Sequence, residues 1–348
     1  MTSTPASIAH PVGVGLVGAG WIGSFHAASL ARRIPGTRLA AVADPAPGAA
    51  EGLAERLGCP RAFTAVADLL ADDDVEAVVV AAPAPTHADL VEAVARAGRP
   101  VFCEKPMAVT LADADRAIAA AADAGVILQV GFNRRFDTGF AAAHAHIAAG
   151  GIGTPQLLRS LTRDPGIPDP SRVPPSTIFL ETLIHDFDAL RYLNPGARAV
   201  DVYAVADALA YPEFKDRGLQ DTAVVVVRFD NGAIATAEAN FNAVYGYDIR
   251  GEAFGSGGMV TAGDIRRTTM ASYGPDGVLT QGWRRNIDLF HDAYVAELAH
   301  FAECVRSGSA PQVTGDDARA ALAIALAAMR SVDAVAPVRL DEVDPPPD

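Results

Sequence analysis

The chain has 348 residues, of which 50% are hydrophobic and 20% charged, a composition typical of folded globular proteins rather than disordered ones. This length exceeds that of one ordinary core, so we expect two domains. The formal net charge is −14, and a surface of that sign repels nucleic-acid phosphates and anionic lipids. The totals therefore argue against a nucleic-acid-binding or membrane-surface protein.

The cysteines and the first residues of the chain indicate a reducing compartment. Cys59, Cys103 and Cys304 are widely spaced, with no CxxC pair or Cys/His cluster. We therefore expect neither a disulfide framework nor a structural zinc site, and we predict no metal. The start, MTSTPASIAHP, lacks the basic region and apolar core of a signal peptide, and no apolar run approaches the ~20 residues that span a bilayer. A soluble, cytoplasmic protein is expected.

Strand and helix patterns alternate along the first part of the chain. Apolar runs of strand length lie at 12–18, 37–45, 74–83, 99–106 and 126–136, and segments with helical spacing lie between them at 19–33, 48–57, 87–98 and 111–125. Continuous apolar strands that alternate with helices predict a parallel sheet covered on both faces. We assign residues 1–132 to a Rossmann dinucleotide-binding domain of the α/β class.

The pattern changes beyond about residue 135. After a helix at 137–149, strand patterns lie at 156–164, 197–208, 219–242 and 247–263, and two helices follow near 287–307 and 316–332. Strands that follow one another without helices between them predict an antiparallel sheet. Asn231-Gly232 lies between two alternating runs, which is a strong hairpin signal. Residues 133–348 are therefore predicted to form an α+β domain with a mostly antiparallel sheet.

A glycine motif lies directly between the first strand and the first helix. In Gly18-Ala-Gly20-Trp-Ile-Gly23, the first glycine permits a tight turn, the second lets a pyrophosphate approach the backbone, and the third allows helix–strand packing. The N-terminus of the helix then offers unpaired N–H groups to the phosphates. A turn that is glycine-rich by chance is the alternative, and the strand–helix setting favours a dinucleotide site.

The end of the second strand indicates which dinucleotide is bound. Asp44 ends this strand about 20 residues beyond the glycines, where a carboxylate accepts hydrogen bonds from the adenosine ribose and repels a 2′-phosphate. Pro45 and Ala46 follow it rather than a basic residue. NAD is therefore predicted in preference to NADP, although nearby arginines in 32–38 leave NADP open.

The fourth strand runs into Cys103-Glu104-Lys105-Pro106. Ligands of doubly wound sheets bind beyond the carboxyl ends of the strands, which is where Lys105 falls. The alternative is a surface lysine in a salt bridge with Glu104. The buried strand before the lysine and the proline after it favour a functional role.

The stretch FLETLIHDFDALRYL, residues 179–193, has apolar residues at three- and four-residue steps and predicts a helix. Glu181 and His185 are four apart, so they share one face of that helix. Histidine has the pKa to accept the proton of a hydroxyl group, whereas the alternative is a core histidine satisfied by Glu181. Asp186 and Asp188 are expected to cap, to pair with the arginine one turn later, or to face water.

The motifs GLVGAGWIG, ADP, CEKP, GFNRRFD and ETLIHDFD occur in an order that strongly resembles the Gfo/Idh/MocA oxidoreductases, and inositol 2-dehydrogenases in particular, over nearly the whole chain. The resemblance implies a Rossmann domain followed by a mostly antiparallel α/β domain whose open sheet face often forms dimers or tetramers. It also implies hydride transfer between NAD(P) and a ring hydroxyl of a polyol or sugar. We therefore expect a small-molecule substrate and a homodimer or homotetramer.

Within this resemblance, Lys105 matches the EKP lysine that reaches the substrate and His185 matches the catalytic histidine. Glu181 stands where close relatives carry aspartate, so its carboxylate is displaced by about one bond length. Misplacements on the ångström scale can cost ~100-fold in rate, and the substrate or its orientation is therefore expected to differ.

The predicted reaction is oxidation of a ring hydroxyl, in which His185 accepts the proton, Lys105 hydrogen-bonds the reacting oxygen and Glu181 orients the pair. The other predicted site residues fall into two groups. The cofactor site comprises Gly18, Gly20, Trp21, Ile22, Gly23, Asp44, Pro83, His87, Glu104 and Lys105. The substrate site comprises Asn133, Arg134, Asp164, Thr182 and Tyr247, for four of which (all but Thr182) a structural role is the alternative.

Two other functions are compatible with the same motifs. One is a glycoside-processing enzyme whose bound NAD is reduced and reoxidised in each cycle, so that no net NADH forms. The other is a regulator that senses NAD(P) on the same fold. Relatives of the regulatory kind tend to have lost the lysine or the histidine, whereas this chain keeps both.

Overall fold

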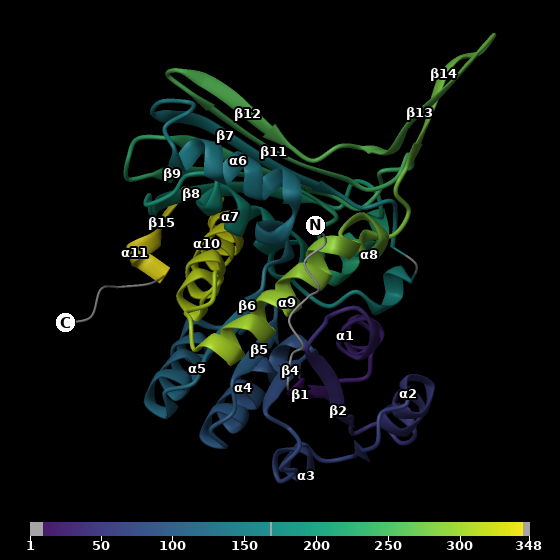
Figure 1. Cartoon of the computed structure of the whole chain (residues 1–348). Helices are drawn as coiled ribbons and strands as arrows, with labels where there is room; N and C mark the ends of the chain where they lie inside the picture. The colour runs from purple at the N-terminus through teal and green to yellow at the C-terminus, as the bar shows by residue number, and fades with distance from the viewer. Residues whose placement is uncertain (1–9, 168, 344–348) are drawn as a thin grey trace, which may run out of the picture. The chain divides into compact units, whose positions relative to one another are not determined.

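The computed structural model describes residues 10–167 and 169–343 (Figure 1). The leader at 1–9, from which no signal peptide is expected, lies outside the described residues. The chain divides into two compact units: unit 1 comprises Met1–Gly131 and Tyr294–Ala318, and unit 2 comprises Phe132–Ala293 and Arg319–Asp348. Relative to the predicted domains, unit 1 gains Tyr294–Ala318, and the boundary lies one residue earlier, before Phe132.

Unit 1 contains a six-stranded parallel sheet in the order β3-β2-β1-β4-β5-β6. The strands are β1 (Val12–Val17), β2 (Thr37–Ala43), β3 (Ala62–Phe63), β4 (Ala77–Val80), β5 (Val101–Glu104) and β6 (Leu128–Gly131). The order reverses between β1 and β4, and in such sheets ligands bind beyond the carboxyl ends of the strands at this point. The predicted Rossmann architecture is confirmed.

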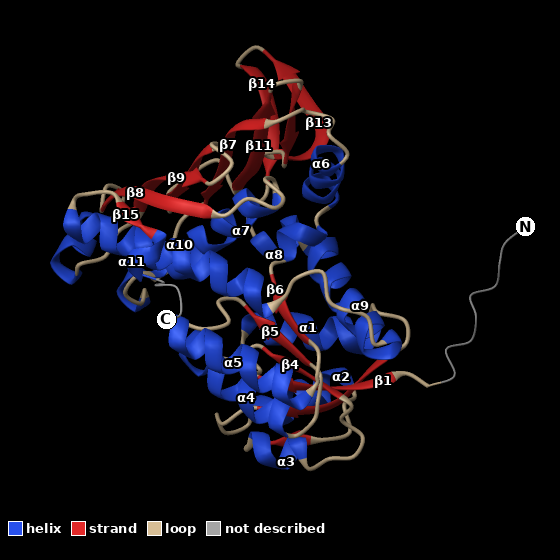
Figure 2. Cartoon of the chain, turned by 90° about the vertical axis from the view of Figure 1, so that its left-hand side faces the viewer, coloured by secondary structure: helices blue, strands red, loops and turns tan. Residues whose placement is uncertain are grey.

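Helices cover both faces of this sheet, with α4 and α5 on one side and α1 and α2 on the other (Figure 2). The helices are α1 (Trp21–Arg32), α2 (Ala49–Leu57), α3 (Val66–Leu70), the 3₁₀ turn η1 (Ala84–Thr86), α4 (His87–Arg96), α5 (Leu111–Ala124) and α9 (His291–Ser307). From α9, the buried Leu298 and Phe301 join the core formed by α1, α2 and β1, β2 and β4. A helix late in the sequence thus completes the first unit.

Unit 2 contains a seven-stranded sheet in the order β12-β11-β7-β10-β9-β8-β15. The strands are β7 (Pro155–Arg163), β8 (Ala199–Asp207), β9 (Thr222–Phe229), β10 (Ile234–Asn240), β11 (Asp248–Gly255), β12 (Gly258–Ala262) and β15 (Val338–Arg339). Only the β7–β10 pair of this sheet is parallel, so the mostly antiparallel prediction is confirmed. The Asn231-Gly232 turn joins β9 to β10 as predicted, and Gly232 has the positive φ of 88° that such a turn requires.

One face of this second sheet is covered by helices. Buried and exposed residues alternate along β9, and the covered face carries Ala223, Val225, Val227 and Phe229. Contacts from α7 reach β7 and β10, and Ser331 of α10 accepts a hydrogen bond from Ala204 N at 3.0 Å. The helical elements are η2 (Asn133–Phe136), α6 (Thr138–Ala148), η3 (Pro170–Arg172), η4 (Ile178–Leu183), α7 (Ile184–Tyr192), η5 (Pro212–Arg217), α8 (Asn286–Leu289), α10 (Gly315–Ala334) and α11 (Leu340–Val343).

The segment at 179–193 is helical, as predicted, but it is not one regular α-helix. The chain forms a π-helix over η4 and becomes α-helical only from Ile184. Two prolines, Pro174 and Pro175, precede it, and Ser176 has a positive φ of 60°, so the chain enters the helix from an irregular turn. A π-turn carries one extra residue, which a pattern of apolar spacings does not register.

A two-stranded hairpin formed by β13 (Arg266–Gly274) and β14 (Gly277–Gly282) was not predicted. Figure 1 shows it extending away from β11 and β12. Its side chains are almost all exposed, so the sequence lacks the alternation that marks a half-buried strand. In the described part of the chain, no helix combines the length and the apolar composition of a membrane span.

Candidate active site

The three motif glycines of unit 1 differ in what surrounds them. A Cβ at Gly18, whose φ is +98°, would lie 2.5 Å from the carbonyl oxygen of Ala81, and a Cβ at Gly23 would lie 1.9 Å from that of Gly18. At Gly20 a Cβ would have no neighbouring atom within 4 Å. The first and third glycines are therefore required for packing, whereas the second borders open space at the start of α1.

This open space has the features of a pyrophosphate cradle. Gly20 is the N-cap of α1, with no side-chain cap and no acidic residue in the first turn of the helix. The unpaired N–H groups of that turn and the helix dipole favour an anion. The neighbouring Trp21 is 57% exposed, whereas Ile22 packs against the core. The residues present thus fit a dinucleotide phosphate.

Asp44 follows β2 and links it to the glycine loop. Its Oδ2 accepts a hydrogen bond from Ala19 N at 2.7 Å, and its Oδ1 accepts one from Ala46 N at 2.8 Å. Each carboxylate oxygen has a second lone pair, so the half-buried side chain can still accept hydroxyl protons from a ribose. The link from Asp44 to Ala19 is a role that the motif alone did not reveal.

The predicted cofactor residues Pro83 and His87 lie after β4. The carbonyl of Pro83 accepts hydrogen bonds from the backbone N–H and the hydroxyl of Thr86, at 2.9 and 2.8 Å. The ring of His87 is buried, with Nδ1 2.7 Å from Pro106 O and Nε2 2.7 Å from Ala82 O. His87 therefore joins the loop after β4 to the loop after β5.

Glu104 and Lys105 lie at the carboxyl end of β5. His26 Nε2 donates to Glu104 Oε1 at 2.6 Å, and Glu104 Oε2 accepts from Lys105 N at 3.2 Å. Burial raises the pKa of Glu104, but the hydrogen bond and charge of His26, with Lys105 and His87, outweigh it and hold that pKa below its ordinary value. The peptide bond between Lys105 and Pro106 is cis, and Lys105 is half-buried.

In unit 2, the predicted catalytic pair straddles the change from π- to α-helix. Glu181 and Thr182 lie in the π-helical turn, and His185 is the second residue of α7. Glu181 and His185 are both partly exposed, whereas Thr182 is buried. The ring of His185 meets that of Phe132 edge to face, with centroids 6.0 Å apart.

Arg134, predicted to bind substrate, lies in a buried cluster. Its Nη1 is 2.7 Å from Asp186 Oδ1, and its Nη2 donates to Thr162 Oγ1 at 2.5 Å. The hydroxyls of Ser160 and Thr162 donate to the two oxygens of Asp186, at 2.5 and 2.7 Å. The guanidinium charge is thereby balanced inside unit 2, and the adjacent Asn133 is buried as well.

The next residues form a second buried ion pair. Arg135 donates through Nε and Nη2 to the two carboxylate oxygens of Asp188, at 2.9 and 2.6 Å. Arg191 lies 3.7 Å from the same carboxylate, so the predicted pairing of Asp188 with the arginine one turn later is confirmed. The alternative that Asp186 and Asp188 face water is wrong, because both are fully buried. The sequence did carry a signal for these ion pairs: two carboxylates lie in a largely apolar helix, and buried charges need partners of opposite charge.

Asp164 and Tyr247 lie near each other, at the end of β7 and just before β11. Burial, and next the negative charge of Asp164, raise the pKa of Tyr247 above its ordinary value. Tyr247 is therefore a neutral hydrogen-bonding group. Its backbone N–H donates to Trp283 O at 2.8 Å, which fixes the base of the β13–β14 hairpin.

Comparison with known proteins identifies the family. Residues 12–132 match the family model described as "Oxidoreductase family, NAD-binding Rossmann fold", and residues 140–261 match the Gfo/Idh/MocA C-terminal domain. The chain belongs to the Gfo/Idh/MocA oxidoreductase family. This Gfo/Idh/MocA protein is thus an oxidoreductase with NAD as its cofactor, and the resemblance found in the sequence motifs is confirmed.

Relatives of this Gfo/Idh/MocA protein match it over nearly all of its length. The myo-inositol 2-dehydrogenase of Thermotoga maritima is 39% identical over 95% of this chain and 99% of its own. The scyllo-inositol 2-dehydrogenase (NAD(+)) of Bacillus subtilis is 37% identical over 95% and 97%. A crystal structure of a probable dehydrogenase from Thermotoga maritima superposes with a TM-score of 0.91 at 38% identity, covering 95% of this chain and all of that one.

Proposed function

We propose that this protein is an inositol 2-dehydrogenase-like enzyme, which oxidises a ring hydroxyl of a cyclic polyol or sugar with NAD. The observation that carries the proposal is the similarity, at 37–39% identity over 95% of the chain, to the named myo- and scyllo-inositol 2-dehydrogenases. The retained Lys105 and His185 support it, because they are the two residues that the resemblance assigns to the chemistry.

The proposed reaction divides the work among three side chains. A ring nitrogen of His185 accepts the hydroxyl proton while the C–H bond electrons leave as hydride and a C=O bond forms. The ammonium of Lys105 hydrogen-bonds the reacting oxygen and stabilises the negative charge that develops there. Glu181 orients the pair. Bound NAD supplies the hydride acceptor, and Asp44 and the glycine loop hold it.

The test is NADH absorbance with purified protein, NAD and a panel of myo-inositol, scyllo-inositol, glucose, galactose, xylose and several glycosides, with NADP in parallel. We expect NADH formation with an inositol and a strong preference for NAD. His185→Ala should lower kcat by ~10²–10⁴-fold, because general acid–base assistance has that magnitude, and should leave the Kd of NAD unchanged.

Two results would contradict this proposal. Normal turnover by His185→Ala would mean that another group accepts the proton. If no compound of the panel gives NADH although NAD binds tightly, the closed-cycle glycoside enzyme or the regulator is favoured. Strong NADH production on one inositol would also show that Glu181 serves in place of the shorter aspartate.

The uncovered face of the seven-stranded sheet supports assembly with a second copy of this chain. Exposed apolar side chains on six neighbouring strands form this outer sheet face: Leu157, Tyr203, Val205, Val224, Val226, Ile234, Phe254 and Met259. Several are direct cross-strand neighbours, such as Tyr203 with Val226 and Leu157 with Phe254. Contiguous apolar patches of this kind mark interaction surfaces. A homodimer or homotetramer through the outer sheet face is therefore proposed.

Sedimentation at several protein concentrations tests this assembly. Val226→Arg places a charge in the centre of the outer sheet face and should lower the mass to that of a smaller species. Leu209→Arg is the matched control, since Leu209 is exposed but lies outside the strands. Equal masses for the wild type and Val226→Arg would refute assembly through this face.

A cytoplasmic location is proposed as well. The three cysteines of the chain are all free in the structure, and Cys103 and Cys304 are buried. Free thiols persist in reducing compartments, which supports the proposal. Fractionation of cells followed by detection of the protein would test it.

A further inference from the structure

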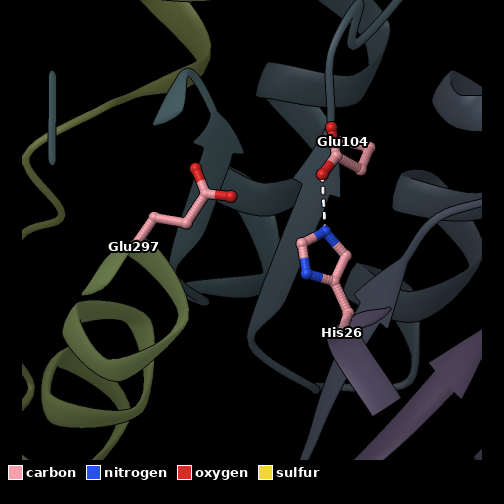
Figure 3. Close-up of side chains that lie close together, drawn as sticks. All are labelled: His26, Glu104 and Glu297. Carbon is pink, nitrogen blue, oxygen red and sulfur yellow. Dashed lines mark hydrogen bonds and ion pairs between the residues drawn. The ribbon is translucent and has the colours of Figure 1, made fainter. Parts of the chain in front are cut away.

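Three titratable side chains from distant segments meet inside unit 1 (Figure 3). His26 lies on α1, Glu104 at the end of β5 and Glu297 on α9, and one ligand atom of each lies within 4.8 Å of the others. His26 and Glu297 are 0% exposed and Glu104 is 6% exposed. The sequence did not single out His26 or Glu297, which become neighbours of Glu104 only through folding.

The cluster is only partly satisfied by hydrogen bonds. His26 Nε2 bonds to Glu104, but both carboxyl oxygens of Glu297 and the Nδ1 of His26 are buried without a hydrogen-bond partner among the described residues. The backbone of Glu297 is held in place, because Gln129 Nε2 donates to its carbonyl at 2.8 Å. The backbone at Glu297 is therefore anchored, and its carboxyl group lies within 4.8 Å of the His26–Glu104 pair.

The surroundings of the cluster are apolar and tightly packed. The ring of His26 lies 5.7 Å from that of Phe102 and 6.0 Å from that of Tyr294, measured between centroids. A Cβ at Gly131 would lie 3.0 Å from the ring of Phe102 and 3.2 Å from Glu104 Oε2, so little space remains beside the carboxylate. A second negative charge next to Glu104 would be costly in this environment.

A metal ion is a poor explanation of the cluster. Two tetrahedral zinc ligands at their usual bond lengths lie roughly 3.3 Å apart. His26 Nε2 and Glu104 Oε1 are 2.6 Å apart, the distance of a charge-assisted hydrogen bond between facing donor and acceptor. A proton, rather than a cation, joins these two groups.

We propose that Glu297 is a positioning residue that remains a neutral carboxylic acid, so that Glu104 is the only anion of the cluster and fixes the chain immediately before Lys105. The protonated carboxyl group lies within 4.8 Å of Glu104 and can rotate to donate a hydrogen bond to it, whereas an ionised carboxylate would repel Glu104. The effect on Lys105 rests on the proposed function above. The protonation of Glu297 does not depend on that function and is tested separately.

The charged groups around Glu297 agree with this assignment. Glu104 faces it from β5 and His26 from α1, while Lys105 and His87 act on Glu104. Burial, and next the negative charge of Glu104, raise the pKa of Glu297 well above its ordinary value of 4.5. Between that value and the raised one, the folded protein binds one proton more than the unfolded chain. The free energy of unfolding that Glu297 contributes therefore falls as the pH rises through this range.

The first experiment compares the melting temperature of the wild type with that of Glu297→Gln from pH 5 to pH 9. Glutamine has the shape of the neutral acid and no proton to lose. We expect the melting temperature of Glu297→Gln, relative to the wild type, to increase steadily with pH. Glu303→Gln is the matched control, because Glu303 is on the same helix but exposed, in a pair with Arg306; its difference from the wild type should stay flat.

The second experiment measures steady-state kinetics with NAD and the polyol that gives activity. Glu297→Gln should keep kcat/KM within about twofold of the wild type. Glu297→Leu has a similar size but cannot form a hydrogen bond, and it should lower kcat/KM for the polyol by about tenfold, since ångström-scale displacement of Lys105 has costs of at least that order. The Kd of NAD should not change in Glu297→Gln.

Several results would overturn the neutral-acid proposal. One is a pair of parallel melting curves for the wild type and Glu297→Gln across the pH range, because Glu297 would then be ionised. A rise in melting temperature on adding Zn²⁺ that Glu297→Gln abolishes would overturn it in favour of a metal site. If Glu297→Leu does not fold, loss of activity in Glu297→Gln would still refute the positioning role. If no substrate is found, the pH series alone tests the neutral acid, so failure of the proposed function is recognised separately.

Discussion

Asp186→Ala should be among the most destabilising single substitutions in unit 2. The side chain is fully buried and accepts hydrogen bonds from Arg134, Ser160 and Thr162. Its removal leaves a buried guanidinium without its counter-charge and two hydroxyl groups without their acceptor. The loss should therefore exceed that of an ordinary polar substitution.

The magnitude follows from these contacts. Removing one partner of a buried ion pair costs about 3–5 kcal/mol, because the remaining charge is uncompensated. Each hydroxyl that loses its acceptor adds up to about 1 kcal/mol, although some of this is recovered when the hydroxyl turns to a backbone carbonyl. We expect the free energy of unfolding of unit 2 to fall by about 3–7 kcal/mol, which is roughly 6–28 °C in Tm for a unit of this size.

Scanning calorimetry is the suitable assay, because the two units need not unfold in a single transition. Asp341→Ala is the control, since Asp341 pairs with Arg339 at 2.6 Å in the same unit but both side chains are about half exposed. That variant should lose no more than about 1 kcal/mol. Replacing both Arg134 by Met and Asp186 by Leu should recover part of the loss, because no buried charge then remains.

A loss below about 1 kcal/mol for Asp186→Ala would refute this reasoning, which rests on the cost of an uncompensated buried charge. It would mean that Arg134 reaches water or another anion when Asp186 is removed. A double variant less stable than Asp186→Ala alone would likewise contradict the account, since it would assign the stability to packing rather than to charge balance.

Three further predictions concern unit 1. Gly20→Val should leave Tm unchanged but weaken NAD binding by at least about tenfold in titration calorimetry, because the valine side chain enters the open cradle. Gly23→Val should instead lower Tm, because a side chain there collides with the backbone. Asp44→Ser should reduce the preference for NAD over NADP in kcat/KM by roughly 10–100-fold, the worth of one to two charge-assisted hydrogen bonds. The pKa of Glu104 is lowered on folding, so the stability that it contributes is present above its ordinary value of 4.5 and is lost as the pH falls through the lowered value. Glu104→Gln should abolish that acid-dependent loss in melting curves recorded from pH 6 to pH 3.

The parts of the molecule that were predictable from the sequence are those defined by neighbouring residues. The glycine motif and Asp44 lie within one strand–helix–strand segment, and the period of the apolar residues determined the strands around them. The Asn231-Gly232 turn is equally local, because its backbone conformation depends on two residues.

The parts that were not predictable depend on partners far apart in the chain. Arg134 and Asp186 are separated by 52 positions, and His26 and Glu104 by 78. No spacing rule connects such residues, so neither the ion pair of Arg134 with Asp186 nor the contact of His26 with Glu104 was predicted. The π-turn at Glu181 was missed for a different reason: a pattern of apolar residues tolerates one extra residue per turn without losing its periodicity.

The assignment of Tyr294–Ala318 to unit 1 has a consequence for how this protein folds during its synthesis. A nascent chain that has emerged only to Gly131 already carries all six strands of the first sheet, yet it lacks Leu298 and Phe301 of the core. Domains usually fold in the order in which the ribosome releases them. Here the two units are interleaved in the order of synthesis: the whole of Phe132–Ala293 is made before the closing helix of unit 1, and Arg319–Asp348 of unit 2 follow that helix. In the interval the unfinished core of unit 1 presents apolar surface to the cell, the kind of surface that chaperones bind.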